Sequence, residues 1–154
     1  MIKLLFMDVD GTLTDGKIYM GNDGEMFKAF DIKDGCGIHD ILPKYGIAPV
    51  IITARNSEIV SRRCEELGIT ECYQGVRNKA QKLREIAEKY HCTLEETAYI
   101  GDDIIDLECM NLCGLKGCPS DAVHEVKQAC DYICTKQGGK GAVREFIEYI
   151  VSRK

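Results

Sequence analysis

Short apolar runs and longer segments with helical spacing alternate along most of the chain. Several runs are unbroken and apolar, which is typical of strands that are buried on both faces of a parallel sheet. The unbroken runs are residues 4–7, 49–52 and 98–100, and the shorter or weaker strand candidates are residues 72–74, 115–118 and 132–134. The sequence therefore predicts several parallel strands separated by other elements.

Apolar stripes with a period near 3.6 residues predict helices between these strands. The stripes consist of Val60, Cys64 and Leu67; of Leu83, Ile86, Ala87 and Tyr90; and of Val143, Phe146, Ile147, Ile150 and Val151. The first of these helices is expected to begin at Asn56 or Ser57 and to end at Gly68. An earlier helix is expected to be capped by Asp34 and to continue to about residue 44.

Two short runs, residues 17–20 and 25–30, interrupt this alternation near the N-terminus. The turn chemistry of residues 21–24, Gly-Asn-Asp-Gly, predicts that the runs form a β-hairpin. The hairpin flap then covers about residues 15–30. The remaining alternation of strands and helices predicts an α/β sandwich with a mainly parallel sheet. With 154 residues, the chain is expected to form one domain, residues 1–154.

The net charge of the chain argues against some classes of function but does not indicate one. Its net charge is −5 and its pI is near 5.3, which disfavours the broad basic face that nucleic-acid binding requires. No apolar run approaches the length of a membrane span, and the first residues lack the pattern of an export signal. We therefore expect a cytoplasmic protein that binds neither nucleic acid nor a membrane.

Cysteine is unusually frequent in this chain. The cysteines are Cys36, Cys64, Cys72, Cys92, Cys109, Cys113, Cys118, Cys130 and Cys134. Because no export signal is recognised, reduced thiols are the expected state. The group at 109, 113 and 118 lacks the C-x-x-C pairing that favours a metal site. We interpret the nine thiols as small apolar side chains.

The stretch Asp8-Val9-Asp10-Gly11-Thr12-Leu13-Thr14 directly follows the first predicted strand. In open α/β sheets, ligands bind beside the carboxyl ends of the strands, at the point where the strand order reverses. Two acids spaced i, i+2 leave a strand on the same side, so Asp8 and Asp10 can approach one small ligand. The alternative interpretation is an Asp-Gly turn after a strand, without chemistry.

Other polar residues follow other predicted strands. They are Thr53, Asp102 and Asp103, and Lys79 lies just beyond a fourth strand. Clustered acids repel one another unless a cation neutralises them, and oxygen ligands with open positions suit Mg²⁺ and a phosphate group. Asp8 is then a plausible nucleophile and Asp10 a plausible general acid and base. Thr53 and Lys79 would stabilise the phosphate oxygens.

In order along the chain, these motifs resemble those of the haloacid dehalogenase superfamily. The matching residues are Asp8-x-Asp10-Gly-Thr, Thr53, Lys79 and Gly101-Asp102-Asp103-x-x-Asp106. The resemblance implies a Rossmann-like three-layer α/β fold. It also implies a Mg²⁺ ion held by the Asp8 carboxylate, the Asp10 carbonyl and Asp102. Asp103 and Asp106 are implied to support these ligands. The second acid, Asp10, is associated with phosphatases and mutases.

Further segments resemble one capless branch of that superfamily, the 3-deoxy-D-manno-octulosonate 8-phosphate (KDO 8-phosphate) phosphatases. They are Asp15-Gly16, Ile18-Tyr19-Met20-Gly21-Asn22, Lys28-Ala29-Phe30, Asp34-Gly35, Thr53-Ala54-Arg55, Tyr73-Gln74-Gly75 and residues 138–145. The branch implies that Ala54, Arg55 and Arg63 help to bind a sugar-acid phosphate. It further implies that the hairpin, in place of a cap, builds a homotetramer whose sites are completed by a neighbouring subunit.

Several alternatives stay open at this stage. Phosphatases of nine-carbon ulosonate 9-phosphates are related, but they tend to carry Glu where this chain has Arg55, which favours the eight-carbon substrate. A mutase would need a mobile cap, and a binding module on a disabled scaffold would not need the intact acids. Two departures from the branch are Thr12, where Val is frequent, and the end of the chain at Lys154, where many members continue.

Overall fold

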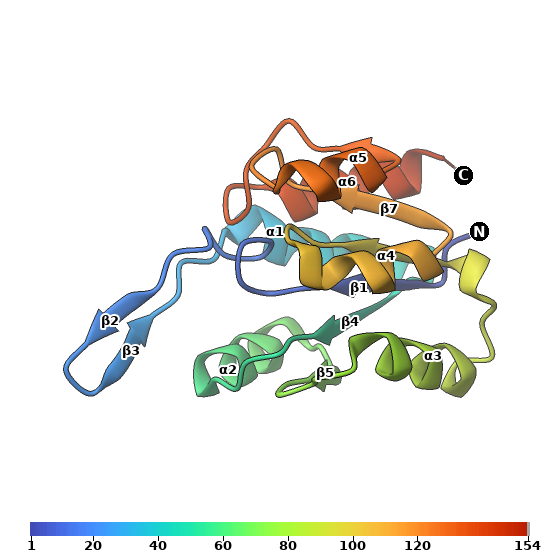
Figure 1. Cartoon of the computed structure of the whole chain (residues 1–154). Coiled ribbons are helices and arrows are strands. Elements are labelled where there is room, and N and C mark those ends of the chain that lie inside the picture. Colours follow the sequence, from blue (N-terminus) through green and yellow to red (C-terminus); the bar gives the residue numbers. More distant parts are fainter. Residues whose placement is uncertain (154) are drawn as a thin grey trace.

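The computed structural model describes residues 1–153, and a six-stranded parallel sheet runs through its centre (Figure 1). The strand order is β5-β4-β1-β6-β7-β8, and every neighbouring pair is parallel. The strands are β1 (Leu4–Met7), β4 (Ala48–Ile52), β5 (Glu71–Tyr73), β6 (Thr97–Ile100), β7 (Leu115–Cys118) and β8 (Tyr132–Ile133). Chain direction along the sheet reverses at β1, because β4 and β5 lie on one side of it and β6 to β8 on the other.

Helices cover both faces of this sheet. One face packs on α1 (Ile32–Cys36), a π-helix (Gly37–Ile41), a 3₁₀ turn (Leu42–Tyr45), α2 (Glu58–Leu67) and α6 (Ala142–Ser152). The other face packs on α3 (Lys79–Lys89), α4 (Leu107–Leu112) and α5 (His124–Ala129). Short 3₁₀ turns precede β6 (Leu94–Glu96) and α4 (Ile104–Asp106). The predicted three-layer α/β sandwich with a mainly parallel sheet is confirmed.

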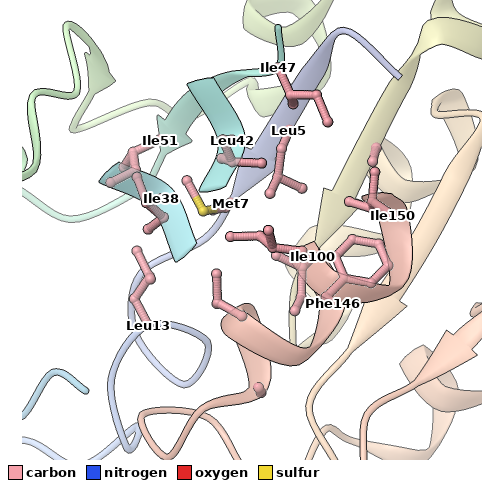
Figure 2. Packing of buried hydrophobic residues seen from close by; sticks show 14 of the residues in the cluster. Leu5, Met7, Leu13, Ile38, Leu42, Ile47, Ile51, Ile100, Phe146 and Ile150 are labelled. Atoms are coloured by element: carbon pink, nitrogen blue, oxygen red, sulfur yellow. The ribbon is translucent and has the colours of Figure 1, made fainter. Parts of the chain in front are cut away.

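Strand β1 shows why the pattern of an unbroken apolar run was informative. Leu5 and Met7 point into the core beneath α6, where Phe146 and Ile38 pack against them (Figure 2). The alternate residues of the strand point into the opposite core. All four side chains are fully buried, and each such burial stabilises the fold by roughly 1.5–3 kcal/mol. A strand packed on both faces must therefore be apolar at every position.

The start of the first helix differs from the prediction. Asp31, not Asp34, caps α1, because its side chain accepts the backbone N–H of Lys33. Asp34 is instead buried, where one of its oxygens accepts the backbone N–H of Arg144 at 2.9 Å. Burial raises the pKa of Asp34 to about 6. Both acids lie ahead of the same apolar stripe, and the sequence alone does not distinguish a buried acid from a capping one.

Other boundaries agree closely with the sequence. Helix α2 follows Ser57 and ends at Gly68, whose φ of 70° is the left-handed conformation that glycine adopts without strain. Strand β5 begins one residue earlier than predicted, and α4 is a short helix that the apolar pattern did not reveal. The nine cysteines, all within the described part of the chain, are free thiols. None of the helices described has the length and apolar character of a membrane span.

The predicted hairpin is present and projects from the body of the molecule (Figure 1). Its antiparallel strands are β2 (Tyr19–Gly21) and β3 (Gly24–Phe27), and a bridge between Thr14 and Phe30 closes its base. Its apolar side chains face outward: Ile18, Met20, Met26 and Phe27 are each about half exposed or more. A hairpin that exposes its apolar side chains is unusual, because such surface is normally buried.

Candidate active site

The candidate site lies at the carboxyl end of β1, where the chain direction along the sheet reverses. Asp8, the first residue after the strand, is almost completely buried. Its Oδ1 lies 3.1 Å from Nζ of Lys79, the first residue of α3. Burial, followed by repulsion from Asp106, raises the pKa of Asp8 to about 6, although Lys79 opposes this shift. The side chain expected to be the nucleophile is thus held next to a cation.

Lys79 connects Asp8 to a second buried acid. Its Nζ also lies 3.2 Å from Oδ1 of Asp106, whose side chain is fully buried. Burial disfavours the charged form of Lys79, but the two carboxylates outweigh burial and raise its pKa. The lysine therefore remains charged, and it is placed to contact the oxygens of a phosphate group bound at Asp8.

Asp106 accepts four hydrogen bonds. Its Oδ1 accepts from Lys79 and, at 2.6 Å, from the hydroxyl of Tyr99 on β6. Its Oδ2 accepts the backbone N–H groups of Asp102 and Asp103, at 3.1 and 3.2 Å. Both oxygens are therefore occupied by donors within the protein. Asp106 shapes the loop after β6 and holds Lys79, which is consistent with the expected supporting role.

Oxygens of Asp8, Asp102 and Asp106 all lie within 4.8 Å of one another. Burial and the neighbouring acids raise the pKa of Asp102 to about 8. Three close carboxylates with one lysine leave an excess of negative charge, and this donor set fits a hard divalent cation such as Mg²⁺. Because Asp106 is already saturated with hydrogen bonds, Asp8 and Asp102 are the carboxylates that can turn toward the ion.

The loop after β1 approaches Asp102 very closely. Gly11 has a φ of 87°, and a Cβ atom at this position would lie 1.9 Å from Oδ2 of Asp102. Only glycine fits here, which explains the Asp-Gly pair of the motif. Thr12, the departure noted in the sequence, is fully buried, and its hydroxyl lies 3.4 Å from Oδ1 of Asp102. This chain therefore brings an additional hydroxyl to the expected metal ligand.

A cleft of about 220 Å³ opens over these residues. Its lining consists of Asp8, Asp10, Gly16, Thr53, Ala54, Arg55, Asp102, Asp103 and Ile105. The structure thus brings most of the predicted site residues to one opening, with Lys79 beneath it. Asp103 lies at the rim, where its side chain accepts the N–H of Ile104 and caps the 3₁₀ turn.

Arg63 lies apart from this cleft within one chain. It belongs to α2, and its guanidinium stacks over the ring of Phe30 with the carbon 5.4 Å from the ring centre. It lines a separate groove between α2 and the hairpin, together with Met26, Phe27 and Lys28. Arg63 is therefore not among the residues that line the cleft in this chain.

Two residues to which the sequence assigned no role, Lys28 and Glu25, contact the site from the hairpin. Nζ of Lys28 lies 2.7 Å from Oδ1 of Asp10 and 3.1 Å from Oε2 of Glu25. Nη1 of Arg55 lies 3.6 Å from Oδ2 of Asp10 and 3.6 Å from Oε2 of Glu25. The signal available in the sequence was a lysine inside the otherwise apolar segment 26–30. A lysine at such a position would ordinarily be expected to point into solvent.

Comparison with known protein families gives a match over the C-terminal part of the chain. A family model described as haloacid dehalogenase-like hydrolase matches residues 65–147. The 3-deoxy-D-manno-octulosonate 8-phosphate phosphatase of Escherichia coli is 44% identical over 150 residues, which are 97% of this chain and 79% of that protein. The protein of the same name from Yersinia pestis is 41% identical over 150 residues, covering 97% of this chain and 80% of that one.

Solved structures resemble the whole described fold. The KDO 8-phosphate phosphatase of Moraxella catarrhalis, in complex with magnesium, phosphate and KDO, matches with a TM-score of 0.94 and 41% identity. The match covers 99% of this chain and 87% of that chain. The cobalt-bound phosphatase from Haemophilus influenzae matches with a TM-score of 0.94 and 38% identity, covering 98% and 88% of the two chains.

Proposed function

This chain belongs to the haloacid dehalogenase-like hydrolase family, and we propose that it is a Mg²⁺-dependent phosphatase that converts 3-deoxy-D-manno-octulosonate 8-phosphate to KDO and phosphate. The observation that carries the proposal is Asp8 at the end of β1, between Lys79 and Asp102. The relatives that are 41–44% identical are named as phosphatases of this substrate. The neighbour from Moraxella holds magnesium, phosphate and KDO together.

The proposed reaction has two displacements at phosphorus. In the first, an oxygen of Asp8 bonds to phosphorus, the ester P–O bond breaks, and the departing sugar oxygen takes a proton from the Asp10 carboxyl. In the second, the Asp10 carboxylate takes a proton from water, the water oxygen bonds to phosphorus, and the P–O bond to Asp8 breaks. The products are the sugar acid and inorganic phosphate, and both acids return to their initial states.

The remaining residues stabilise charge during both displacements. Lys79 lies 3.1 Å from Asp8 and would reach the oxygens of a phosphate bound there, and Thr53 lines the cleft beside Asp8. Their donors would stabilise the charge that spreads over the equatorial oxygens of the transition state. The side chains of Asp8 and Asp102 and the Asp10 carbonyl would hold Mg²⁺, which supplies further positive charge to the phosphate. Asp103 and Asp106 support these ligands.

A panel of phosphate esters assayed with Mg²⁺ tests the proposal directly. It should contain the eight-carbon and nine-carbon 3-deoxy-2-ulosonate phosphates together with simple hexose phosphates, and inorganic phosphate should be measured. We expect the highest kcat/KM on the eight-carbon ester. A preference for the nine-carbon ester would transfer the assignment to that class, and an isomerised ester detected by phosphorus NMR would indicate a mutase. No turnover on any ester would favour a binding module.

Arg55 is proposed to recognise the carboxylate of the sugar acid. Its side chain is partly exposed at the cleft, and a guanidinium can bind a carboxylate through two parallel hydrogen bonds. Arg55→Ala is expected to lower kcat/KM for the sugar-acid phosphate by about 10- to 100-fold, the value of one charged hydrogen-bond pair. Simple phosphate esters should be affected much less.

The control for this prediction is Arg84→Ala, because Arg84 is exposed on α3 away from the cleft. It should leave kcat/KM unchanged for both kinds of ester. Equal losses for Arg55→Ala on both kinds of ester would show that this arginine serves the fold or the phosphate, and would remove it from substrate recognition.

We further propose a homotetramer in which a neighbouring subunit completes each site, with Arg63 and Ala54 contributing to substrate binding. The exposed apolar side chains of the hairpin support this, because pairing of hairpins into a closed barrel would bury them and remove the strand edges. The groove between α2 and the hairpin contains Arg63, Met26 and Phe27. A role in the cytoplasm, in precursor synthesis for lipopolysaccharide or capsule, belongs to the same proposal, and cell fractionation checks the compartment.

Charged residues in the hairpin should dissociate this assembly. Met26→Glu, alone or with Tyr19→Glu, is expected to shift sedimentation from about four times the chain mass of 17.2 kDa to the monomer. Activity on the sugar acid should fall, whereas Mg²⁺ binding should persist. Ile133→Glu, at an exposed position on β8 far from the hairpin in sequence, is the control. A fully active wild-type monomer at assay concentration would rule out the completed-site arrangement.

A further inference from the structure

Lys28 is buried in a segment whose apolar side chains are exposed. Its side chain is only 2% exposed, whereas Met26 and Phe27, the two residues before it, are 66% and 49% exposed. The usual arrangement of a surface hairpin is the reverse, with apolar residues inside and lysine in solvent. The hairpin therefore directs Lys28, and not these apolar residues, toward the body of the molecule.

Removing a lysine from water is costly unless partners compensate. The desolvation penalty of a buried ion is recovered only with close, well-oriented acids. Lys28 has two such partners: Oδ1 of Asp10 at 2.7 Å and Oε2 of Glu25 at 3.1 Å. A set of apolar residues of similar volume in place of Lys28, Asp10 and Glu25 together would stabilise the fold about as well. Stability alone thus does not explain a lysine here, and its contact with Asp10 suggests a role in the reaction.

The two oxygens of Asp10 are in different situations. Lys28 holds Oδ1, while Oδ2 lies 3.6 Å from the partly exposed Arg55, which lines the cleft. Asp10 itself is partly exposed, and it follows the strand by three residues, so its backbone does not fix its side chain. The contact with Lys28 does fix the side chain of Asp10. Its Oδ1 is bound by the lysine, and its Oδ2 is left on the side of the cleft.

We propose that Lys28 is a positioning residue for Asp10, through which the hairpin sets the orientation of the proton-transferring carboxyl. The inference rests on the proposed phosphatase function and deepens it. Glu25 holds the lysine from the other side, so Lys28 stays in place when Asp10 carries a proton. In the first displacement, the Asp10 carboxyl then presents Oδ2 to the departing oxygen, which takes its proton as the ester P–O bond breaks.

The inference predicts that loss of Lys28 slows the first displacement most for esters whose leaving group must be protonated. A benzylic alcohol must be protonated as it leaves phosphorus, whereas a nitrophenolate leaves without help. The two probe esters are 4-nitrobenzyl phosphate and 4-nitrophenyl phosphate, which are similar in size and carry no carboxylate for Arg55. The rate of release of the alcohol or phenol in a single turnover isolates the first displacement.

We expect Lys28→Met to lower this rate by about 10²-fold for the benzyl ester, the effect of a misplaced catalytic group. The rate for the phenyl ester should change little, and the KM of both esters should be unaffected. Lys28→Arg, which keeps a cation at this position, should recover part of the loss for the benzyl ester. Lys17→Met removes an exposed lysine from the same hairpin and should leave both rates unchanged.

The outcomes separate the possible roles. Equal losses on the two esters, or no loss on either, would overturn the positioning role. If Lys28→Met fails to fold by circular dichroism, Lys28→Gln provides the same comparison with a polar side chain of smaller volume. Absence of wild-type turnover on both esters and on the sugar-acid phosphate would overturn the proposed function and this inference together, which distinguishes that failure from a failure of Lys28 alone.

Discussion

Asp8→Asn is expected to reduce phosphate release to background. An amide is a poor nucleophile, so the aspartyl-phosphate cannot form, and the change also removes one of the two carboxylates that can turn toward the metal ion. The fold should survive, because a neutral side chain at this position avoids the burial of a charge and the repulsion from Asp106, which together raise the pKa of Asp8 to about 6. Turnover is measured with Mg²⁺, and folding is measured by thermal melting.

Asp40→Asn is the matched control, since Asp40 is exposed and pairs with its neighbour His39. It should retain full activity. If Asp8→Asn kept activity near that of the wild type, another group would have to be the nucleophile, and the assignment of the site would be wrong. If instead it lost activity together with its melting transition, the loss would reflect the fold and the test would move to Asp8→Glu, which keeps the charge but displaces the oxygen.

The sequence predicted the part of the site that depends on the backbone of the sheet. Asp8, Thr53 and Asp102 each follow a buried parallel strand. Because parallel strands end at one edge, residues just beyond them must converge, whatever the details of packing. The spacing of the apolar runs therefore sufficed to bring these side chains together, and the cleft in the structure contains all three.

The residues that the sequence did not reveal depend on side-chain paths. Lys28 reaches Asp10 from a hairpin whose register shifts between Tyr19 and Met20, and residue spacing does not encode such an irregularity. Asp106 was expected to support the metal ligands only from its family resemblance. Its four hydrogen bonds with Lys79, Tyr99 and the loop after β6 depend on tertiary packing.

Lys79 carries the second large effect, because it is the cation between two buried acids. Lys79→Met is expected to abolish turnover by removing the donor to the phosphate oxygens. It should also destabilise the protein by about 3–5 kcal/mol, the usual cost of leaving a buried charge without its partner. Asp8 would lose the cation that lies 3.1 Å from its Oδ1, and Asp106 would keep Tyr99 and two backbone donors.

The dependence of this destabilisation on pH and on Mg²⁺ distinguishes an electrostatic role of Lys79 from a packing role. Without Lys79, the folded-state pKa of Asp8, already raised to about 6, must rise further above its unfolded value. The folded state then binds more protons than the unfolded state, so its deficit decreases as the pH falls through this range. Mg²⁺ should likewise reduce the deficit, because the ion binds only the folded arrangement of carboxylates. Chemical denaturation at pH 8 and pH 5.5, with Mg²⁺ or with EDTA, measures these differences.

Lys82→Met provides the comparison on the same helix. Lys82 lies one turn after Lys79 and pairs with Glu85 at the surface, where such pairs contribute about 0–1 kcal/mol. Its loss should therefore be small and independent of Mg²⁺. If Lys79→Met were destabilised equally at both pH values and in both metal conditions, the lysine would act through packing of its aliphatic chain. The carboxylates of Asp8, Asp102 and Asp106 would then have to be balanced by something other than Lys79 and a bound cation.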